Sequence, residues 1–174
     1  TIDTVYDSLY INNETTLSYT YPHSGKKITK RIPIYPESFI FDIEIDMTPV
    51  ANSLLEERFS FSWIGGLPPT EKDSTAEEYF FGTYLYQGGE LLDVKASKGD
   101  SFKNDYRGKT DWVAIRNKYF INSLISDLSI GATLSARSFE LNSGNYIPIY
   151  SAGLKFNAPG ISVSQFFGPL DVDI

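Results

Sequence analysis

Apolar and polar residues alternate along much of this chain, which is the pattern of β-strands that bury one face. The clearest run covers residues 59–63, where Phe59, Phe61 and Trp63 alternate with serines. Turn-forming residues divide the first part of the chain into a predicted antiparallel meander of strands over residues 5–11, 15–21, 26–34 and 39–47, with turns at 12–14, 22–25 and 35–38. Later strands are predicted over residues 79–86, 91–94, 128–141, 147–157 and 161–167. The pattern therefore predicts a mainly β protein, an antiparallel β-sandwich of two packed sheets.

The turn at residues 35–38 also predicts the register of the two strands that it joins. A four-residue turn gives the apolar pairs Ile34–Phe39, Ile32–Phe41 and Ile28–Ile45 on one face, and the polar pairs Arg31–Asp42, Thr29–Glu44 and Lys27–Asp46 on the other. A slip by one residue would place charged side chains opposite apolar ones. Both faces therefore favour this register.

One stretch, residues 109–125, has the features of a helix. It contains neither Gly nor Pro, and Thr110 or Asp111 can cap the free N–H groups of a first turn. We predict a helix of about three turns, packed on a sheet. The apolar residues lie on most sides of the helical wheel, which indicates a helix buried on most sides, or one that stops before Ile121 and continues as extended chain.

Two other segments are predicted to be loops. Residues 70–78 are polar and acidic, and residues 96–108 carry several basic side chains without a clear period. We see no internal repeat and no low-complexity linker, so residues 1–174 are interpreted as a single domain.

The composition is that of a folded domain and limits its partners. Hydrophobic residues make up 41% and aromatic residues 15% of the 174 positions, enough for a substantial core. The net charge of −7 argues against nucleic acid, because phosphate contacts need a basic face. The sequence has no cysteine, which excludes disulfides, thiolate metal ligands and cysteine nucleophiles. It also has no apolar run near the roughly 20 residues that span a bilayer. It begins with Thr and no signal-like leader, so we expect a piece of a longer protein.

Four short motifs resemble a known family in the same order along the chain. They are Trp112-Val113-Ala114 followed by Lys118-Tyr119-Phe120, the segment Tyr35-Pro36-Glu37-Ser38-Phe39 before a strand, Gly65-Gly66-Leu67 before a polar insert, and Phe167-Gly168-Pro169-Leu170-Asp171. Together they resemble the later part of the large periplasmic domain of bacterial YidC-type membrane protein insertases. The resemblance covers essentially all 174 residues, and it implies a fragment without that family's first strands and without its transmembrane segments.

The resemblance implies a fold, a location and a function. The fold would be the twisted supersandwich shared with sugar mutarotases, with one or two short helices late in the chain. The location would be the periplasmic side of the bacterial inner membrane. The function would be accessory: assisting the insertion and folding of nascent inner-membrane proteins together with the Sec translocon and its accessory subunits. No catalysis, cofactor or metal is implied.

The motif residues are expected to have structural roles. Trp112, Tyr119 and Phe120 would hold the predicted helix to the sheet, although aromatic residues can also present a binding face to a partner. Gly168 and Pro169 would shape the exit of the chain toward the membrane.

An acidic row offers a possible metal site. Asp42, Glu44 and Asp46 project from one face of a predicted strand, as the ligands of a hard cation can. The alternative is a solvated face paired with Lys27 and Arg31 across the hairpin. The alternative is favoured because a flat row of carboxylates wraps an ion poorly.

A basic cluster offers a possible contact with lipid or a partner protein. Lys27, Lys30 and Arg31, next to Lys26, could touch anionic lipid headgroups. An exposed strand is the favoured interpretation, because Lys also protects strand edges from aggregation.

Enzymatic activity is not expected. His23 is the only histidine and lies in a predicted turn, so a Ser-His-Asp triad, a His-rich metal site or a mutarotase-like site would depend on it alone. The main alternative to an insertase domain is a secreted β-sandwich that binds carbohydrate on exposed aromatic rings. Burial of Trp63 and Trp112 would count against that alternative.

Overall fold

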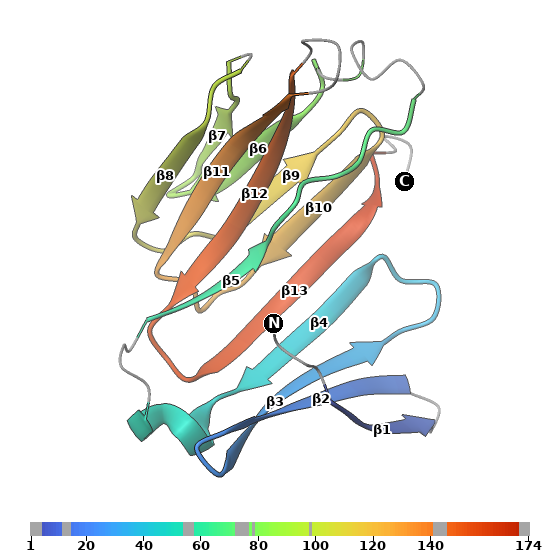
Figure 1. The fold of residues 1–174 in the computed structure, drawn as a ribbon, viewed down its shortest axis with the longest axis vertical. Coiled ribbons are helices and arrows are strands. Elements are labelled where there is room, and N and C mark those ends of the chain that lie inside the picture. The colour runs from blue at the N-terminus through green and yellow to red at the C-terminus, as the bar shows by residue number, and fades with distance from the viewer. Residues whose placement is uncertain are drawn as a thin grey trace.

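The chain forms two antiparallel sheets packed face to face, as predicted (Figure 1). The computed structural model describes residues 5–11, 15–53, 58–71, 77, 79–97, 99–140 and 146–170. The strands are β1 (Val5–Ile11), β2 (Thr15–His23), β3 (Lys26–Ile34), β4 (Ile40–Asp46), β5 (Phe59–Trp63), β6 (Gly82–Gln87), β7 (Glu90–Val94), β8 (Phe102–Arg107), β9 (Trp112–Arg116), β10 (Phe120–Ile125), β11 (Gly131–Glu140), β12 (Tyr146–Phe156) and β13 (Gly160–Pro169).

The chain crosses from one sheet to the other several times. The large sheet has the order β1-β2-β3-β4-β13-β10-β9-β6-β7, and the small sheet has the order β5-β12-β11-β8. The last strand, β13, therefore lies between β4 and β10, where it joins the meander to the rest of the large sheet. In Figure 1 the small sheet lies over the half of the large sheet that is formed by β10, β9, β6 and β7, whereas β1–β4 extend beyond it.

The core lies between the sheets. The large sheet contributes the fully buried Leu85, Val113 and Leu124, and the small sheet contributes Leu134 and Leu154. In β5 the apolar residues face this core while the serines face outward, as the alternation predicted.

The predicted helix over residues 109–125 is wrong: this stretch is the hairpin of β9 and β10. The Asn117 side chain closes the hairpin, because its Oδ1 accepts hydrogen bonds from the backbone N–H groups of Tyr119 (3.0 Å) and Phe120 (2.7 Å). Both strands are interior strands with neighbours on each side, so Ala114 and Ser123 on the outer face are buried as well as the core residues. Apolar residues on both faces remove the period-two pattern, and a helical wheel then looks filled on all sides.

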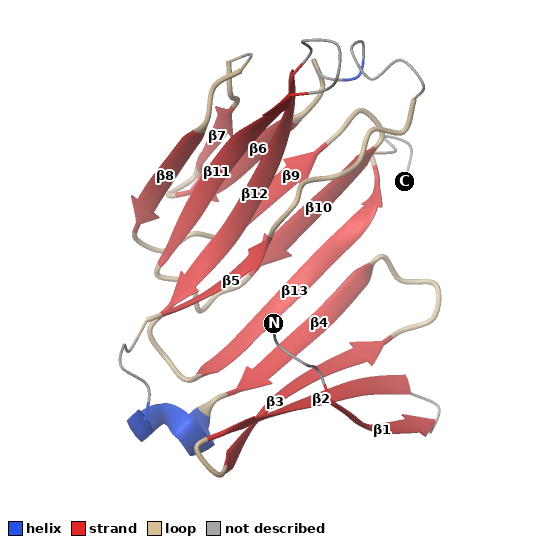
Figure 2. Cartoon of the chain, in the orientation of Figure 1, coloured by secondary structure: helices blue, strands red, loops and turns tan. Residues whose placement is uncertain are grey.

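The short helices expected late in the chain are also absent from the described residues. The structure instead has η1, a 3-10 helix over Thr48–Ser53. This helix lies between β4 and β5 in the chain and packs on β3 (Figure 2). It is far too short to cross a membrane, and no other described segment forms a helix that could.

The predicted loop over residues 96–108 contains a strand, β8. This strand lies at the edge of the small sheet and pairs only with β11. Two side chains, Phe102 and Tyr106, are half-buried and pack against the core, and the other four are exposed. Two apolar residues four positions apart are too few to show the alternation that identifies a strand.

The predicted register of β3 and β4 is wrong by two residues. The structure pairs Thr29 with Asp46 and Arg31 with Glu44. The connection is wider than a four-residue turn, because Glu37 adopts a positive φ of 61° and the backbone N–H of Ile40 donates a hydrogen bond to the Ser38 hydroxyl oxygen at 3.0 Å. A shift of two residues keeps every side chain on its predicted face, so Arg31 still lies opposite an acidic residue.

Candidate interaction surface at the aromatic end of the sheets

Exposed aromatic side chains gather where β4 and β10 begin and where β5 and β13 end. We call this surface the aromatic end; its residues are Phe39, Trp63, Tyr119, Phe120 and Phe167. In Figure 1 the start of β4, the start of β10 and the end of β13 lie on the side of the molecule marked C, and β5 ends nearer the middle. Trp63 is half-buried, and the other four are exposed to 50% (Phe39), 41% (Tyr119), 36% (Phe120) and 39% (Phe167). Large apolar side chains at this exposure are a common property of interaction surfaces.

Strand pairing explains why these rings meet. Phe120 is paired with Pro169, two residues beyond Phe167 on the same face of β13. The Phe167 ring therefore stacks on the Phe120 ring, with centroids 6.4 Å apart and planes 10° apart. On its other side it stacks on Trp63 of the small sheet at 6.2 Å. Aromatic pairs of this kind contribute about 1 kcal/mol each beyond their burial.

Gly168 and Pro169 shape this end of β13. A Cβ atom at Gly168 would lie 2.9 Å from the Phe166 ring and 3.2 Å from Phe39, so only glycine fits without movement of these rings. The backbone N–H of Phe167 donates to the Phe39 carbonyl at 2.9 Å, and that of Leu170 donates to the Tyr119 carbonyl at 2.7 Å. The chain is therefore fixed to the aromatic end up to residue 170.

A polar cluster borders the rings. Glu71 accepts a hydrogen bond from the Tyr119 hydroxyl and pairs with the Lys118 ammonium at 2.7 Å. The hydrogen bonds from Lys118 and Tyr119 lower the pKa of Glu71, and the bonds to Glu71 and Tyr119 raise the pKa of Lys118. The Lys118 ammonium also lies 4.9 Å from the centre of the Tyr119 ring, in a cation–π arrangement.

Glu77, in a segment predicted to be a surface loop, is fully buried behind this cluster. Its carboxylate accepts hydrogen bonds from the Thr70 N–H (2.7 Å), the Thr70 hydroxyl (2.8 Å) and the Glu71 N–H (3.0 Å). Burial opposes the charged form, but these hydrogen bonds outweigh it, so the pKa of Glu77 is lowered. The buried carboxylate fixes the backbone that carries Glu71.

Comparison with known proteins identifies the family. Residues 4–173 match the family model of the YidC periplasmic domain. The chain belongs to this family. Curated relatives are the proteins named membrane protein insertase YidC from Chlorobium luteolum, 34% identical over 78% of this chain, and from Pelodictyon phaeoclathratiforme, 32% identical over 79%. The protein of the same name from Chlorobium limicola is 29% identical over 85% of the chain. The chain spans 24%, 24% and 29% of the length of these three relatives.

Four of the five motif residues of this periplasmic domain lie together at the aromatic end. Tyr119, Phe120, Gly168 and Pro169 meet through the pairing of β10 with β13. They fix a hairpin and a strand end rather than a helix. Trp112 lies away from them, at the start of β9, where its ring stacks on Tyr86 at 5.7 Å.

The predicted basic cluster does not form one patch. Lys27 and Arg31 are exposed on one face of β3, whereas Lys30 lies on the opposite face. The Lys30 ammonium lies 5.8 Å from the centre of the Phe61 ring, and its burial lowers its pKa. Lys27 is also near the β2–β3 turn, at the end of β3 away from the aromatic end.

The acidic row of β4 has protein partners. Asp42 accepts a hydrogen bond from the Ser164 hydroxyl at 2.7 Å, and Asp46 accepts one from the Thr48 N–H at 2.9 Å. The hydrogen bonds from Thr48 lower the pKa of Asp46. Within the described residues no three His, Asp or Glu side chains are grouped as metal ligands would be. His23 is the last residue of β2, opposite Lys26, rather than a residue of the turn.

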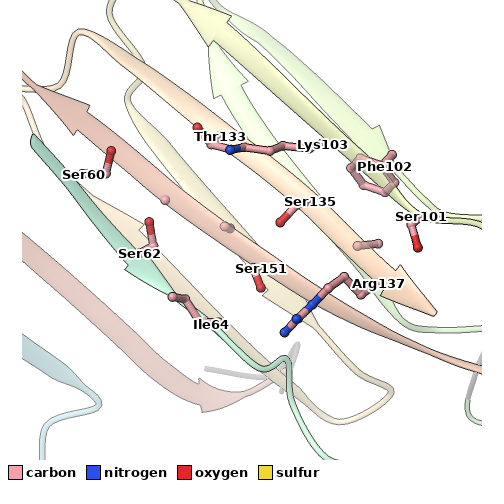
Figure 3. A pocket seen from close by; sticks show the side chains of 13 residues that line it. Ser60, Ser62, Ile64, Ser101, Phe102, Lys103, Thr133, Ser135, Arg137 and Ser151 are labelled. Carbon is pink, nitrogen blue, oxygen red and sulfur yellow. The ribbon is translucent and has the colours of Figure 1, made fainter. Parts of the chain in front are cut away.

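Sequence reasoning missed a hollow of about 760 Å³ on the outer face of the small sheet (Figure 3). It is lined by short side chains, among them Ser60, Ser62 and Ser151, with Lys103 and Arg137 beside them. Neither Trp nor Tyr lines it, and Phe102, which does, is half-buried and packs against the core. The hollow therefore lacks the row of exposed Tyr or Trp rings that the carbohydrate-binding alternative requires.

Proposed function

We propose that this chain is the extracytoplasmic part of a membrane protein insertase, and that it assists the insertion and folding of inner-membrane proteins without catalysing a reaction. The observation that carries the proposal is the match of residues 4–173 to the YidC periplasmic domain. The relatives are about three times as long as this chain and are named as insertases. In this proposal the segments that cross the membrane and move the substrate belong to the rest of the protein.

The proposed partners are the Sec translocon, its accessory subunits and nascent membrane proteins. A domain that serves such partners needs exposed apolar side chains on a rigid support, and the sandwich offers both. Leu91 is exposed on the edge strand β7, and Phe139 is exposed near the end of β11. Edge strands and exposed aromatic residues are frequent elements of protein interfaces.

The test uses the full-length protein in cells, with a photoreactive amino acid at Leu91 or at Phe139. The expected result is a crosslink to a subunit of the translocon from at least one of these positions. The matched control is Leu85 of the neighbouring strand β6, which is fully buried and should give no crosslink. Loss of the domain should also slow the insertion of translocon-dependent membrane proteins. Unchanged insertion together with the absence of translocon crosslinks would refute the proposal.

The carbohydrate-binding alternative gains no support from the two tryptophans. Trp63 and Trp112 are both half-buried, and each already stacks on another ring of the chain. A sugar platform needs a free aromatic face, so these two residues do not provide one.

A further inference from the structure

The aromatic end combines exposed apolar side chains with charged side chains that form ion pairs. The stacked rings of Phe120 and Phe167 lie on the face of the large sheet toward Trp63, and the Phe39 ring lies on the other face, against Phe166. Tyr119 precedes β10 at the same end of the strands. The charged groups beside these rings are paired: the Lys118 ammonium lies 2.7 Å from the Glu71 carboxylate, which also binds the Tyr119 hydroxyl. Charges that neutralise each other cost less to bring toward a medium of low dielectric constant than single charges do.

The kinds of side chain at this surface suit one environment. Phenylalanine adds apolar area, and tyrosine combines an apolar ring with a polar hydroxyl. Rings of that amphipathic kind are enriched where lipid headgroups meet the hydrocarbon of a bilayer.

The path of the chain places this surface next to whatever follows residue 170. Pro169 is paired with Phe120, and the Leu170 N–H is bound to the Tyr119 carbonyl. In the proposed function, the relatives' remaining length includes the membrane-spanning part. A segment that continues from residue 170 into the membrane would start from the aromatic rings.

From these observations we propose that the aromatic end contacts the interfacial zone of the lipid bilayer, through Phe39, Tyr119, Phe120 and Phe167. This proposal rests on the proposed function and adds an orientation to it. Strands β4, β10 and β13 all begin or end at this surface, so they run away from the membrane rather than lying along it. Leu128, which follows β10, is then held away from the lipid, because β10 alone extends roughly 17 Å at about 3.3 Å per residue.

The test measures the depth of a nitroxide label in the full-length protein, reconstituted in phospholipid vesicles. The label is attached to a cysteine in the variants Phe39→Cys and Tyr119→Cys, and this chain contributes no cysteine of its own. The matched control is Leu128→Cys, because Leu128 is also an exposed apolar residue (57%) but lies beyond the other end of β10. Collisions with oxygen, which concentrates in lipid, are compared with collisions with a water-soluble nickel complex.

The expected result is a severalfold higher ratio of oxygen to nickel collisions at positions 39 and 119 than at position 128. Equal ratios at the three positions would overturn the proposal. Protection of positions 39 and 119 from both reagents would also overturn it, because a protein partner would then cover the surface. Phe39→Cys keeps the test valid if loss of the Tyr119 hydroxyl unfolds the polar cluster.

Insertion of a reporter membrane protein by the same vesicles separates this proposal from the proposed function. Insertion that depends on the domain without lipid contact at positions 39 and 119 would overturn only the bilayer contact. Lipid contact at these positions in a protein whose insertion activity does not need the domain would support the contact and overturn the accessory function.

Discussion

Replacing Glu77 by Gln should destabilise the chain at neutral pH and much less in acid. The carboxylate is fully buried and accepts three hydrogen bonds, two of them from backbone N–H groups at 2.7 and 3.0 Å. A glutamine keeps the size of the side chain, and its carbonyl oxygen can still accept both N–H groups, because they share one carboxylate oxygen, while its NH₂ group faces the Thr70 hydroxyl. What is lost is the negative charge. Hydrogen bonds to a charged group contribute roughly 1.5–3 kcal/mol each and neutral ones roughly 0.5–1.5 kcal/mol, so weakening three of them should cost about 3 kcal/mol.

The pH dependence follows from the lowered pKa of Glu77. A carboxylate whose pKa is lower in the folded than in the unfolded state stabilises the fold above the unfolded pKa, near its ordinary value of 4.5. That stability disappears as the pH falls through the folded pKa. The difference between Glu77→Gln and the original chain should therefore be largest near pH 7 and shrink below pH 4.5.

Thermal unfolding followed by circular dichroism at a series of pH values measures this difference. For a domain of this size each kcal/mol corresponds to about 2–4 °C, so the melting temperature at pH 7 should fall by roughly 6–12 °C. Glu90→Gln is the matched control, because Glu90 is exposed at the start of β7; its effect should stay within about 0.5 kcal/mol. A fall of the same size at pH 7 and well below the folded pKa, or no fall at pH 7, would show that the hydrogen-bonded carboxylate does not hold this segment.

Three further substitutions test the aromatic end and the small sheet by urea unfolding of the chain. Phe167→Ala removes the ring that stacks on both Trp63 and Phe120, and it should cost about 2–3 kcal/mol. The fluorescence emission of Trp63 should shift to the red, and an unchanged emission spectrum would contradict the stack. Asn117→Ala removes the acceptor that closes the β9–β10 hairpin, together with the Nδ2 donor to the Pro68 carbonyl, and should cost about 2 kcal/mol; a loss below about 0.5 kcal/mol would rule out this role. Gly153→Ala should cost about 1–3 kcal/mol, because the new Cβ would overlap the Ser62 hydroxyl; the added change Ser62→Gly should recover part of the loss, and no recovery would refute the steric argument.

The sequence predicts most strands of both sheets, and it fails where the alternation of apolar and polar residues is lost. The alternation of Phe59, Phe61 and Trp63 identified β5 because its other face meets solvent. Interior strands such as β9 and β10 bury residues on both faces, so Ala114 and Ser123 interrupt the alternation and the pair resembled a helix. Local turn residues could not reveal this, because burial of both faces depends on β6 and β13, which lie elsewhere in the chain.

The candidate surface was predicted in part. The motifs pointed to Tyr119, Phe120, Gly168 and Pro169, and the structure brings these four residues together. Their partners could not be predicted from local pattern. Lys118 meets Glu71 across 47 positions of the sequence, and a buried carboxylate such as Glu77 has the same local signature as an exposed one.

The sequence encoded on either side of residues 1–174 in the full gene tests the central claim most directly. A domain of a membrane protein insertase predicts an apolar segment of roughly 20 residues upstream and several more soon after Ile174. A stop codon shortly after Ile174, together with a cleavable signal peptide upstream, would contradict the claim and would describe a secreted protein instead.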